Sequence, residues 1–397
     1  MREALLGAAD ALVVAPGQSA ELGLAEGPLA LRRAWPRVRD RLTLEYRAAD
    51  GAILAGQWFA EREALDGVAR ATARHGPVAR LALDGGELGE VLVAGVGVDR
   101  GLPGLRAIAA RDGATLLAHR AERRAVVRLA QPEPERYAKV VAPARAEALA
   151  AALGRVAELA GAAFSAPEVL EVDSGAGVVV CSRVEGTALH ESLAGDSAEV
   201  AATRAGSALA ALHAQDPPLG ASVHGAAEEA GVVEAWIARV AALDPVLAAR
   251  ASAVAADVTR AVGGLGAPER AVPLHRDLHD KQILIGAEGS VGLIDFDTLA
   301  AGDPALDLAN LLVHLELRAL QGHCAAESAG RAAAALLEGY RPARAVEAHL
   351  DAYARATRLR LVCVYAFRPR SEAVVEAMLD RAADRHRPRP CKDCAIG

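Results

Sequence analysis

The sequence predicts a mixed α+β fold in which β-rich units come first and a mostly helical unit follows. Short apolar runs separated by turn residues fill the first half of the chain, and longer stretches with helical spacing fill the second half. One pair of short apolar segments interrupts the helical half. A chain of 397 residues with 52% hydrophobic residues has enough material for two or three packed units. We place four regions at 1–104, 105–185, 186–384 and 385–397.

Residues 1–104 are predicted to form a β-rich extension. Apolar segments flank the turn signals Asp50-Gly51 and Asp84-Gly85-Gly86, and such pairs are typical of hairpins. The predicted hairpins pair 41–47 with 53–59 and 78–83 with 90–94. No motif that carries chemistry is visible here, so this region is interpreted either as a cap on the following lobe or as a separate partner-binding domain.

Residues 105–185 are predicted to form a small lobe of five strands with one inserted helix. The helix begins at Pro143, a residue favoured in the first turn, and its apolar residues recur at helical spacing from Ala146 to Ala160. The predicted strands are 115–120, 124–129, 137–141, 169–172 and 178–181.

Residues 186–384 are predicted to be mostly helical. One helix covers about 197–214 and ends before Asp216-Pro217-Pro218, because proline cannot continue a helix. The tail at 385–397 is rich in Arg and Pro and is expected to be flexible.

Composition and charge exclude several classes of protein. The formal net charge is −7 and no basic face is visible, so no nucleic-acid partner is expected. No apolar run reaches the ~18–20 residues that cross a bilayer, and no signal peptide is visible, so no membrane partner is expected. Five mostly isolated cysteines suit a reducing compartment, which predicts a cytoplasmic location. His386, Cys391 and Cys394 lack a fourth zinc ligand, so no zinc site is predicted.

Three oxygen-bearing side chains converge at one end of a predicted hairpin, whose apolar segments lie within 274–285 and 291–297. Asp277 and Gln282 lie before or at the first segment, and Asp295 ends the second. Gln282 follows Asp277 by five residues, and Asp295 follows Gln282 by thirteen. In phosphoryl transfer, one carboxylate orients the attacking hydroxyl group and accepts its proton, while oxygen ligands hold Mg²⁺ against the nucleotide phosphates.

These residues resemble the motifs of the aminoglycoside phosphotransferase and choline kinase group, whose members share a protein-kinase-like fold. The resemblance implies a small β-rich lobe, a helical lobe, and transfer of the γ-phosphate of Mg-ATP to a hydroxyl group of a sugar, aminosugar, aminoglycoside or similar small molecule. It implies that Asp277 is the catalytic base, Asp295 the main magnesium ligand and Gln282 a second ligand. The matching motifs are His275-Arg276-Asp277-Leu278-His279, Ile294-Asp295-Phe296 and Gly302-Asp303-Pro304-Ala305-Leu306-Asp307.

Two residues depart from the motifs of this group. Gln282 stands where the group has Asn, so its amide oxygen lies one methylene further from the backbone, and the second metal site is expected to be altered or water-mediated. Similar Gln variants occur in maltokinase-like members, which indicates that subgroup. Arg276 replaces the common Gly and resembles the protein-kinase form.

Further motif residues are expected to support the site. The resemblance gives this role to His275, His279 and Asp297. Asp303 is expected to cap a helix that begins at the following proline, because Asp accepts hydrogen bonds from free amides. Asp307 is where the family places an acid that braces the catalytic loop; the alternative is a solvated helix residue.

The small lobe is expected to contact the nucleotide. Taken alone, Lys139 would be interpreted as a solvent-facing strand residue, but the resemblance makes it the third-strand lysine that contacts the phosphates. Its carboxylate partner is expected on the next helix, at Glu147 or, as a second choice, at Glu158.

Two loops of the small lobe are further candidates. Arg123 or Arg124, between the first two strands, could contact phosphate, although exposed turn arginines are the favoured interpretation. The segment 182–186, which includes Glu185, resembles the hinge whose backbone hydrogen-bonds adenine.

Two other function classes stay open from the sequence. A nucleotide-binding module without catalysis is suggested by Gln282, but Asp277 and Lys139 count against it. A protein kinase is disfavoured because only seven residues separate Asp295 from Asp303, which leaves no room for a long activation segment. The acceptor, the choice between ATP and GTP, and the oligomeric state do not follow from the sequence.

Overall fold

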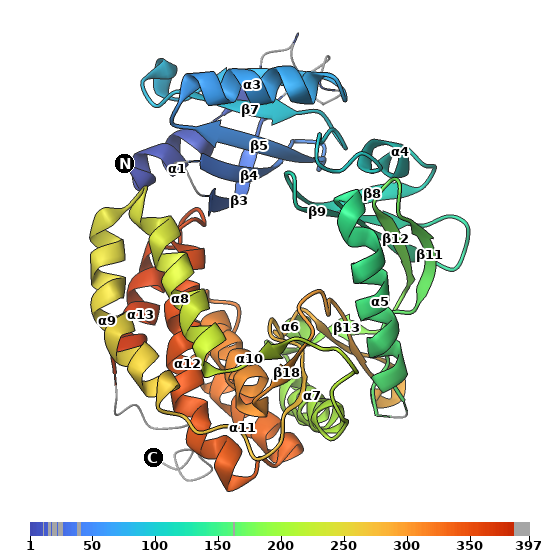
Figure 1. The fold of residues 1–397 in the computed structure, drawn as a ribbon, viewed down its shortest axis with the longest axis vertical. Coiled ribbons are helices and arrows are strands. Elements are labelled where there is room, and N and C mark those ends of the chain that lie inside the picture. The colour runs from blue at the N-terminus through green and yellow to red at the C-terminus, as the bar shows by residue number, and fades with distance from the viewer. Residues whose placement is uncertain are drawn as a thin grey trace.

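The computed structural model of the chain describes residues 1–10, 12–14, 17, 22, 27–37, 41–161 and 163–384. The predicted flexible tail, together with Cys391 and Cys394, lies outside these residues. The chain forms three parts, which Figure 1 shows: an N-terminal unit, a small lobe and a helical lobe. The predicted mixed α+β fold is confirmed. Within the described ranges, no helix combines the length and apolar character that crossing a membrane requires.

The N-terminal unit is an antiparallel sheet of five strands in the order β3-β4-β5-β7-β6. Both predicted hairpins are confirmed, since β4 pairs with β5 and β6 pairs with β7. Two helices, α1 and α3, are not among the predicted elements; α3 packs Leu65 and Val68 against Phe59 and Leu92 of the sheet. The elements are α1 (Arg2–Asp10), β1 (Val13–Val14), β2 (Gly27–Pro28), β3 (Ala30–Arg37), β4 (Arg41–Arg47), β5 (Ile53–Phe59), α3 (Arg62–Ala73), β6 (Val78–Ala82) and β7 (Glu90–Ala94).

The small lobe is a second five-stranded antiparallel sheet, in the order β11-β12-β10-β9-β8. The predicted strands are confirmed, and the inserted helix α5 begins at Pro143 as expected. Ala146, Leu149 and Leu153 of α5 are buried against Val179 and Cys181 of the sheet, which fixes which face of α5 points to solvent. The elements are α4 (Leu105–Ala109), β8 (Ala114–Arg120), β9 (Arg124–Leu129), β10 (Arg136–Val141), α5 (Pro143–Leu159), β11 (Val169–Asp173) and β12 (Val178–Ser182).

The helical lobe contains two small three-stranded sheets, β13-β16-β17 and β14-β18-β15, among its helices. The predicted helix near 197–214 is α7, and the predicted hairpin is β16 paired with β17. The elements are β13 (Thr187–Ala188), α6 (Leu189–Ser192), α7 (Ala198–His213), β14 (Val223–His224), α8 (Ala226–Ala241), α9 (Pro245–Gly263), β15 (Val272–Leu274), β16 (Ile283–Ile285), β17 (Val291–Leu293), β18 (Ala300–Gly302), α10 (Pro304–Leu320), α11 (Ala326–Tyr340), α12 (Arg344–Tyr365) and α13 (Glu372–Ala383).

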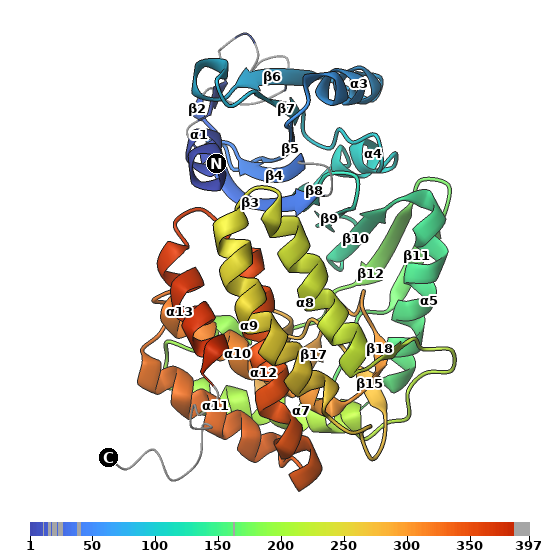
Figure 2. The same cartoon turned by 60° about the vertical axis from the view of Figure 1, so that its left-hand side comes forward.

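The N-terminal unit contacts both lobes. On the small-lobe side, the buried carboxylate of Glu45 accepts a hydrogen bond from the amide of His119 at 3.0 Å. On the helical side, the amide of Ala34 donates to the carbonyl of Phe367 at 3.0 Å. Figure 2 shows β3 above the ends of α8 and α9. The unit therefore bridges the two lobes rather than covering the small lobe alone.

Candidate active site

The hairpin of β16 and β17 brings Gln282, which precedes β16, close to Asp295, which follows β17. The amide of Ile294 donates to the carbonyl of Gln282 at 3.0 Å, so the following residue, Asp295, lies close to Gln282. The imidazole Nε2 of His275 lies 2.9 Å from the carbonyl oxygen of Ile294, and its ring packs on Phe296 with centroids 4.5 Å apart. Residues 275–282, which we call the catalytic loop because the sequence predicts the base there, thus lie against the segment that carries Asp295 and Asp297.

Asp307 holds the beginning of the catalytic loop. Its fully buried carboxylate accepts hydrogen bonds from the amides of His275 and Arg276, both at 2.6 Å. Burial acts to raise the pKa of Asp307, but its contacts with His213, His275 and these amides lower the pKa below the ordinary value. Arg276 has a φ of 70°, in the left-handed region that favours glycine. The two bonds therefore stabilise a backbone conformation that would otherwise be unfavourable.

One face of α10 continues this support along the whole loop. Asn310 donates to the carbonyl of Leu278 at 2.6 Å, and the ring of His314 packs on that of His279 with centroids 5.0 Å apart. Arg318 donates two hydrogen bonds to Asp280, at 2.7 and 2.8 Å. These side chains and Asp307 recur at helical spacing, so a single helix fixes the positions of loop residues 275–280.

Asp280 is a site-supporting residue that the sequence did not single out. It is fully buried, and His190 contacts it at 2.8 Å from the other side of the loop. Arg318 and His190 outweigh the effect of burial and lower the pKa of Asp280. The available signals were the position of Asp280 directly after the motif and the spacing of Asp307, Asn310 and Arg318 on one predicted helix.

Two cations of the small lobe reach Asp295 and Asp297. The Lys139 ammonium lies 2.8 Å from Asp295 and also hydrogen-bonds Asp297. The Arg124 guanidinium donates to Asp297 at 3.0 Å and lies 3.5 Å from Asp295. Burial opposes ionisation of Asp295, but Lys139 and Arg124 hold its pKa well below the usual range. Asp295 has a φ of 69°, a strained backbone of the kind that concentrates at functional sites.

The structure does not bring the predicted helix carboxylate to Lys139. Glu147 is exposed and hydrogen-bonds Ser174, and Glu158 is also exposed. The prediction that either one pairs with Lys139 is wrong in this structure. The reason is the buried stripe of α5, which faces the sheet and turns Glu147 away from the site. Lys139 pairs instead with the carboxylates of the other lobe.

The other predicted residues lie as follows. The amide oxygen of Gln282 accepts from the amide of His279 at 3.2 Å, so it stabilises the loop itself. Asp303 caps α10 by accepting from the amide of Ala305 at 2.9 Å, as predicted. The carboxylate of Glu185 is exposed and pairs with Arg183 at 3.1 Å.

His279 and His213 are packed histidines. Burial lowers the pKa of His279 to about 4, so its ring is neutral at neutral pH. His213 lies against Tyr340 at 2.8 Å and Asp307 at 3.4 Å.

Asp277 is the accessible acid of the loop. Its side chain is 45% exposed, and its nearest cation, Arg360, lies 3.7 Å away. Arg360 also donates to Asn310 at 2.6 Å, so α10 and α12 together position this guanidinium. The carboxylate of Asp277 is therefore accessible to the hydroxyl group of a molecule that enters from solvent.

The oxygen donors of the site fit a magnesium ion. Asp295 and Asp297 offer carboxylate oxygens side by side, and Mg²⁺ typically takes one or two carboxylates together with water and substrate phosphates. Within the described ranges, no three His, Cys, Asp or Glu side chains form a closed metal cage. Two carboxylates side by side are a donor set that fits such a metal.

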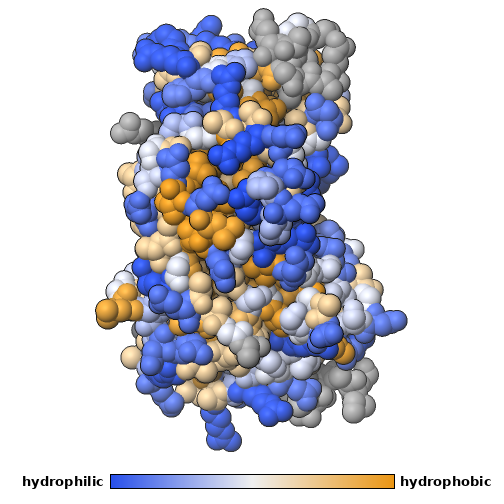
Figure 3. Space-filling view, turned by 90° about the vertical axis from the view of Figure 1, so that its right-hand side faces the viewer, coloured by the Kyte–Doolittle hydropathy of each residue, from blue (hydrophilic) through white to orange (hydrophobic). Residues whose placement is uncertain are grey.

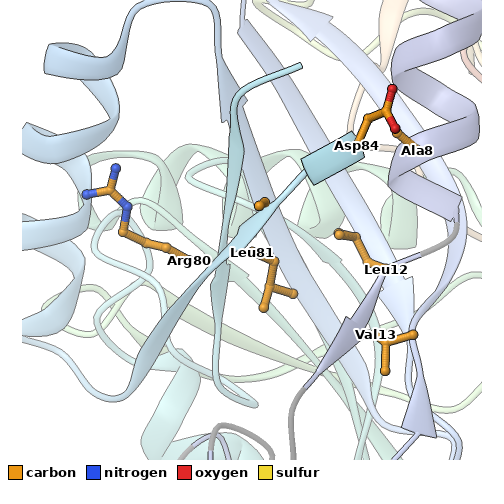
Figure 4. Close-up of a pocket in the computed structure, with 7 residues that line it drawn as sticks. Ala8, Leu12, Val13, Arg80, Leu81 and Asp84 are labelled. Carbon is orange, nitrogen blue, oxygen red and sulfur yellow. The ribbon is translucent and has the colours of Figure 1, made fainter. Parts of the chain in front are cut away.

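Other surface features lie away from this chemistry. A hollow in the N-terminal unit is lined by apolar side chains with Arg80 and Asp84, and Figure 4 shows Arg80 pointing away from Leu81. Arg80 is already paired with Asp66 and Glu90.

Apolar residues gather below the N-terminal unit on the face that Figure 3 shows. Leu170 and Val172 of edge strand β11 are exposed, and nothing in the structure shows what covers them.

Comparison with known proteins identifies a family. Residues 105–350, more than half of the chain, match the model of the phosphotransferase enzyme family. A search of the curated proteins gave no match. None of the comparisons tests a maltokinase-like subgroup, which stays a prediction.

Several solved structures are similar to this chain. Amicoumacin kinase hAmiN, in complex with AMP-PNP, Ca²⁺ and Ami, is similar with a TM-score of 0.53 and 13% identity, over 71% of this chain and 92% of that chain. A choline/ethanolamine kinase family protein from Mesorhizobium loti gives a TM-score of 0.48 and 18% identity, over 70% and 91%. Aminoglycoside phosphotransferase APH(3'')-Id from Streptomyces rimosus gives 0.43 and 23%, over 63% and 96%. The predicted two-lobe, protein-kinase-like fold is confirmed.

Proposed function

Because the chain belongs to the phosphotransferase enzyme family, we propose that it transfers the γ-phosphoryl group of ATP to a hydroxyl group of a small molecule, with Asp277 as the base. The observation that carries this proposal is the meeting of Lys139 and Arg124 from one lobe with Asp295 and Asp297 from the other, beside the catalytic loop. Cations and carboxylates converge there as phosphoryl transfer requires.

Asp277 is suited to act on the acceptor. It is the loop carboxylate that solvent reaches, whereas Asp280 and Asp307 are buried and already accept hydrogen bonds. A general base must reach the proton that it accepts, so geometry favours Asp277. Arg360, 3.7 Å away, lies beside this carboxylate and helps to orient it.

Asp295 and Asp297 would hold Mg²⁺, which when bound neutralises charge on the phosphate oxygens of the nucleotide. Gln282 supports this site through the loop amide that it binds, and its oxygen is a second ligand only if that bond opens. Lys139 and Arg124 then turn from the carboxylates to the phosphates, since both cations sit where these groups meet. The backbone at Glu185 is the proposed adenine contact.

An ADP-release assay tests the proposal. Purified protein is incubated with Mg-ATP and a panel of sugars, aminoglycosides, choline and other alcohols, beside Asp277→Asn and the control Asp112→Asn, an exposed acid of the small lobe. We expect acceptor-dependent ADP release that falls by about a thousandfold in Asp277→Asn, because the amide cannot accept the proton. Asp112→Asn should behave as the wild type.

The ADP-release assay, together with thermal melting of the same protein, separates the alternatives. Nucleotide binding, seen as a rise in melting temperature with Mg-ATP, without release from any acceptor would favour a binding module without catalysis. No nucleotide binding at all would overturn the proposal. Release with GTP in place of ATP would revise the phosphate donor. The cytoplasmic location stays a prediction from the sequence.

A further inference from the structure

Five arginines meet where the N-terminal unit, the small lobe and the helical lobe come together. We name this group the arginine arc, and its members are Arg37, Arg120, Arg123, Arg239 and Arg368. Figure 1 shows the three units that contribute them: β3 in the N-terminal sheet, the β8–β9 hairpin in the small lobe, and α8 and the segment after α12 in the helical lobe.

Specific contacts fix the arc beside the catalytic groups. Arg37 reaches from the end of β3 and donates to the carbonyl of Ala121, at the tip of the β8–β9 hairpin, at 3.2 Å. The same tip carries Arg120 and Arg123, and the next residue is Arg124, which bonds Asp297. The tip therefore joins the arc to the metal-binding carboxylates.

Trp35 ties two of the arginines together from different lobes. The guanidinium of Arg120 lies 4.9 Å from one ring centroid of Trp35, and that of Arg368 lies 5.3 Å from it. Cation–π contacts orient a guanidinium but leave its N–H groups free to donate in its plane. The Nε atom of Arg120 is buried without a hydrogen-bond partner.

The arc has little neutralising charge of its own. Among the described residues, Arg120, Arg123 and Arg239 make no ion pair and donate no side-chain hydrogen bond. The nearby carboxylate of Glu122 is already paired with Arg100 at 2.7 Å and Arg41 at 3.7 Å. Burial and four neighbouring guanidinium groups lower the pKa of Arg120 to about 9.

This excess of positive charge contrasts with the whole chain. The formal net charge of the chain is −7, yet five cations gather around the tip of the β8–β9 hairpin. Like charges in a partly buried region repel one another unless an anion joins them. A guanidinium presents its donors in a planar fork that matches phosphate and carboxylate oxygens.

We propose that the arginine arc binds an anionic group of the acceptor. The molecule whose hydroxyl group gives its proton to Asp277 then already carries a phosphate or a carboxylate. This inference rests on the proposed function and names its substrate class. In the reaction, the acceptor hydroxyl oxygen forms a bond to the γ-phosphorus, the bond from that phosphorus to the β–γ bridging oxygen breaks, the hydroxyl proton passes to Asp277, and ADP leaves.

The arc is separate from the groups assigned to ATP. Lys139 and Arg124 lie on β10 and β9, and the hinge lies beyond β12, all in the small lobe. Arg37, Arg239 and Arg368 come from the two other units. The anion that they bind is therefore assigned to the second substrate.

Matched acceptors test the proposal in the full chain. ADP release with Mg-ATP is measured for glucose, glucose 6-phosphate, glucuronate, choline and streptomycin at equal concentration. The variants are Arg120→Gln and Arg123→Gln, with Arg111→Gln, an exposed small-lobe arginine, as control. We expect release with the anionic sugars, and a loss of about tenfold in acceptor kcat/KM in each arc variant. The KM for ATP should stay unchanged, and Arg111→Gln should match the wild type.

Binding provides a readout that does not depend on turnover. Glucose 6-phosphate and inorganic phosphate are titrated by calorimetry into the protein saturated with ADP and Mg²⁺. We expect glucose 6-phosphate to bind, with a Kd about tenfold higher in Arg120→Gln. If inorganic phosphate and glucose 6-phosphate bind with the same Kd, the sugar adds nothing to the affinity. The arc is then an anion site and not an acceptor site.

Three outcomes would overturn the inference. Release with only neutral or cationic acceptors, unaffected by the arc variants, would leave the kinase function standing and remove the anionic acceptor. A raised KM for ATP in Arg120→Gln would assign the arc to the nucleotide. Absence of any anion binding, whatever the activity, would leave the arc as a contact between units only.

Discussion

The catalytic loop and the Asp295–Asp297 segment lie side by side, yet they are held in different ways. The loop is fixed from within its own lobe by buried groups of α10: Asp307, Asn310 and Arg318 each hydrogen-bond a different part of it. The carboxylates of the Asp295–Asp297 segment are bonded from the other lobe, by Lys139 and Arg124. Arg124 and Asp295 are partly exposed to solvent.

The two sets of contacts differ in burial. This difference suits the first set to positioning the loop and the second set to binding a ligand. Buried pairs are costly to break, because each leaves a charge without a partner in a region of low polarity. Partly exposed pairs exchange partners at small cost, because water replaces what is lost. The loop that carries Asp277 is therefore firmly positioned, whereas the proposed function has the cations opposite Asp295 pass to a nucleotide.

The largest expected effect is on stability, at the buried pair beneath the loop. Arg318→Met leaves Asp280 buried without its bidentate partner, which should lower the free energy of unfolding by about 3–5 kcal/mol. Chemical denaturation monitored by circular dichroism measures it. The control Arg331→Met removes an exposed pair with Glu199 and should change stability by less than about 1 kcal/mol. Equal effects of the two variants would break the comparison.

The next effect is on activity, across the lobes. Lys139→Met should lower kcat/KM for ATP by about a hundredfold, because a phosphate contact is lost. Stability should fall by only about 1 kcal/mol, since Asp295 and Asp297 keep Arg124. Steady-state kinetics and thermal melting of the same sample give both numbers. A large loss of stability with normal kinetics would show that Lys139 positions the segment as α10 positions the loop.

A pH effect sharpens the picture of the loop. Burial holds the pKa of His279 at about 4, against an ordinary value of 6.5, so the unfolded chain binds more protons between these values. Stability should therefore fall as the pH drops from about 6.5 to 4, by about 1–3 kcal/mol from this residue. His279→Gln should flatten this fall in melting temperature, whereas the exposed His75→Gln should not. An unchanged slope in His279→Gln would show that the pKa of His279 is the same in the folded and the unfolded chain.

The smallest effect is expected at the more exposed cation. Arg124→Gln should raise the KM for ATP by about three- to tenfold and leave the melting temperature unchanged, because 46% of its side chain is exposed. Arg145→Gln, exposed on α5, is the control. A fall in melting temperature for Arg124→Gln would mean that its pair with Asp297 stabilises the closed arrangement of the lobes.

Local patterns in the sequence predicted much of this architecture. Turn signals located both N-terminal hairpins, and proline and apolar spacing located the start of α5. The hairpin of β16 and β17 explains why Asp295 returns to Gln282. In each case the deciding interactions are between near neighbours in the chain, so the sequence carries their signal. The helices α1 and α3 lie in a region where strand signals dominated.

Contacts between distant segments were not predictable in this way. Glu147 was the expected partner of Lys139, but the packing of α5 turned it to solvent and gave Lys139 the carboxylates of the other lobe. Asp280 directly follows the motif, but its pairing with Arg318, 38 residues later, became visible only in the structure. No local pattern relates residues that far apart.

The sequence by itself determined the order of the β-rich and helical units, the catalytic hairpin and the residue types at its end. Only the tertiary structure decided which of these side chains are buried, which cations face them, and that three units bring the arginine arc together. The physical reason is that propensity and turn chemistry act over a few residues, whereas burial and charge pairing depend on packing between segments that the chain separates.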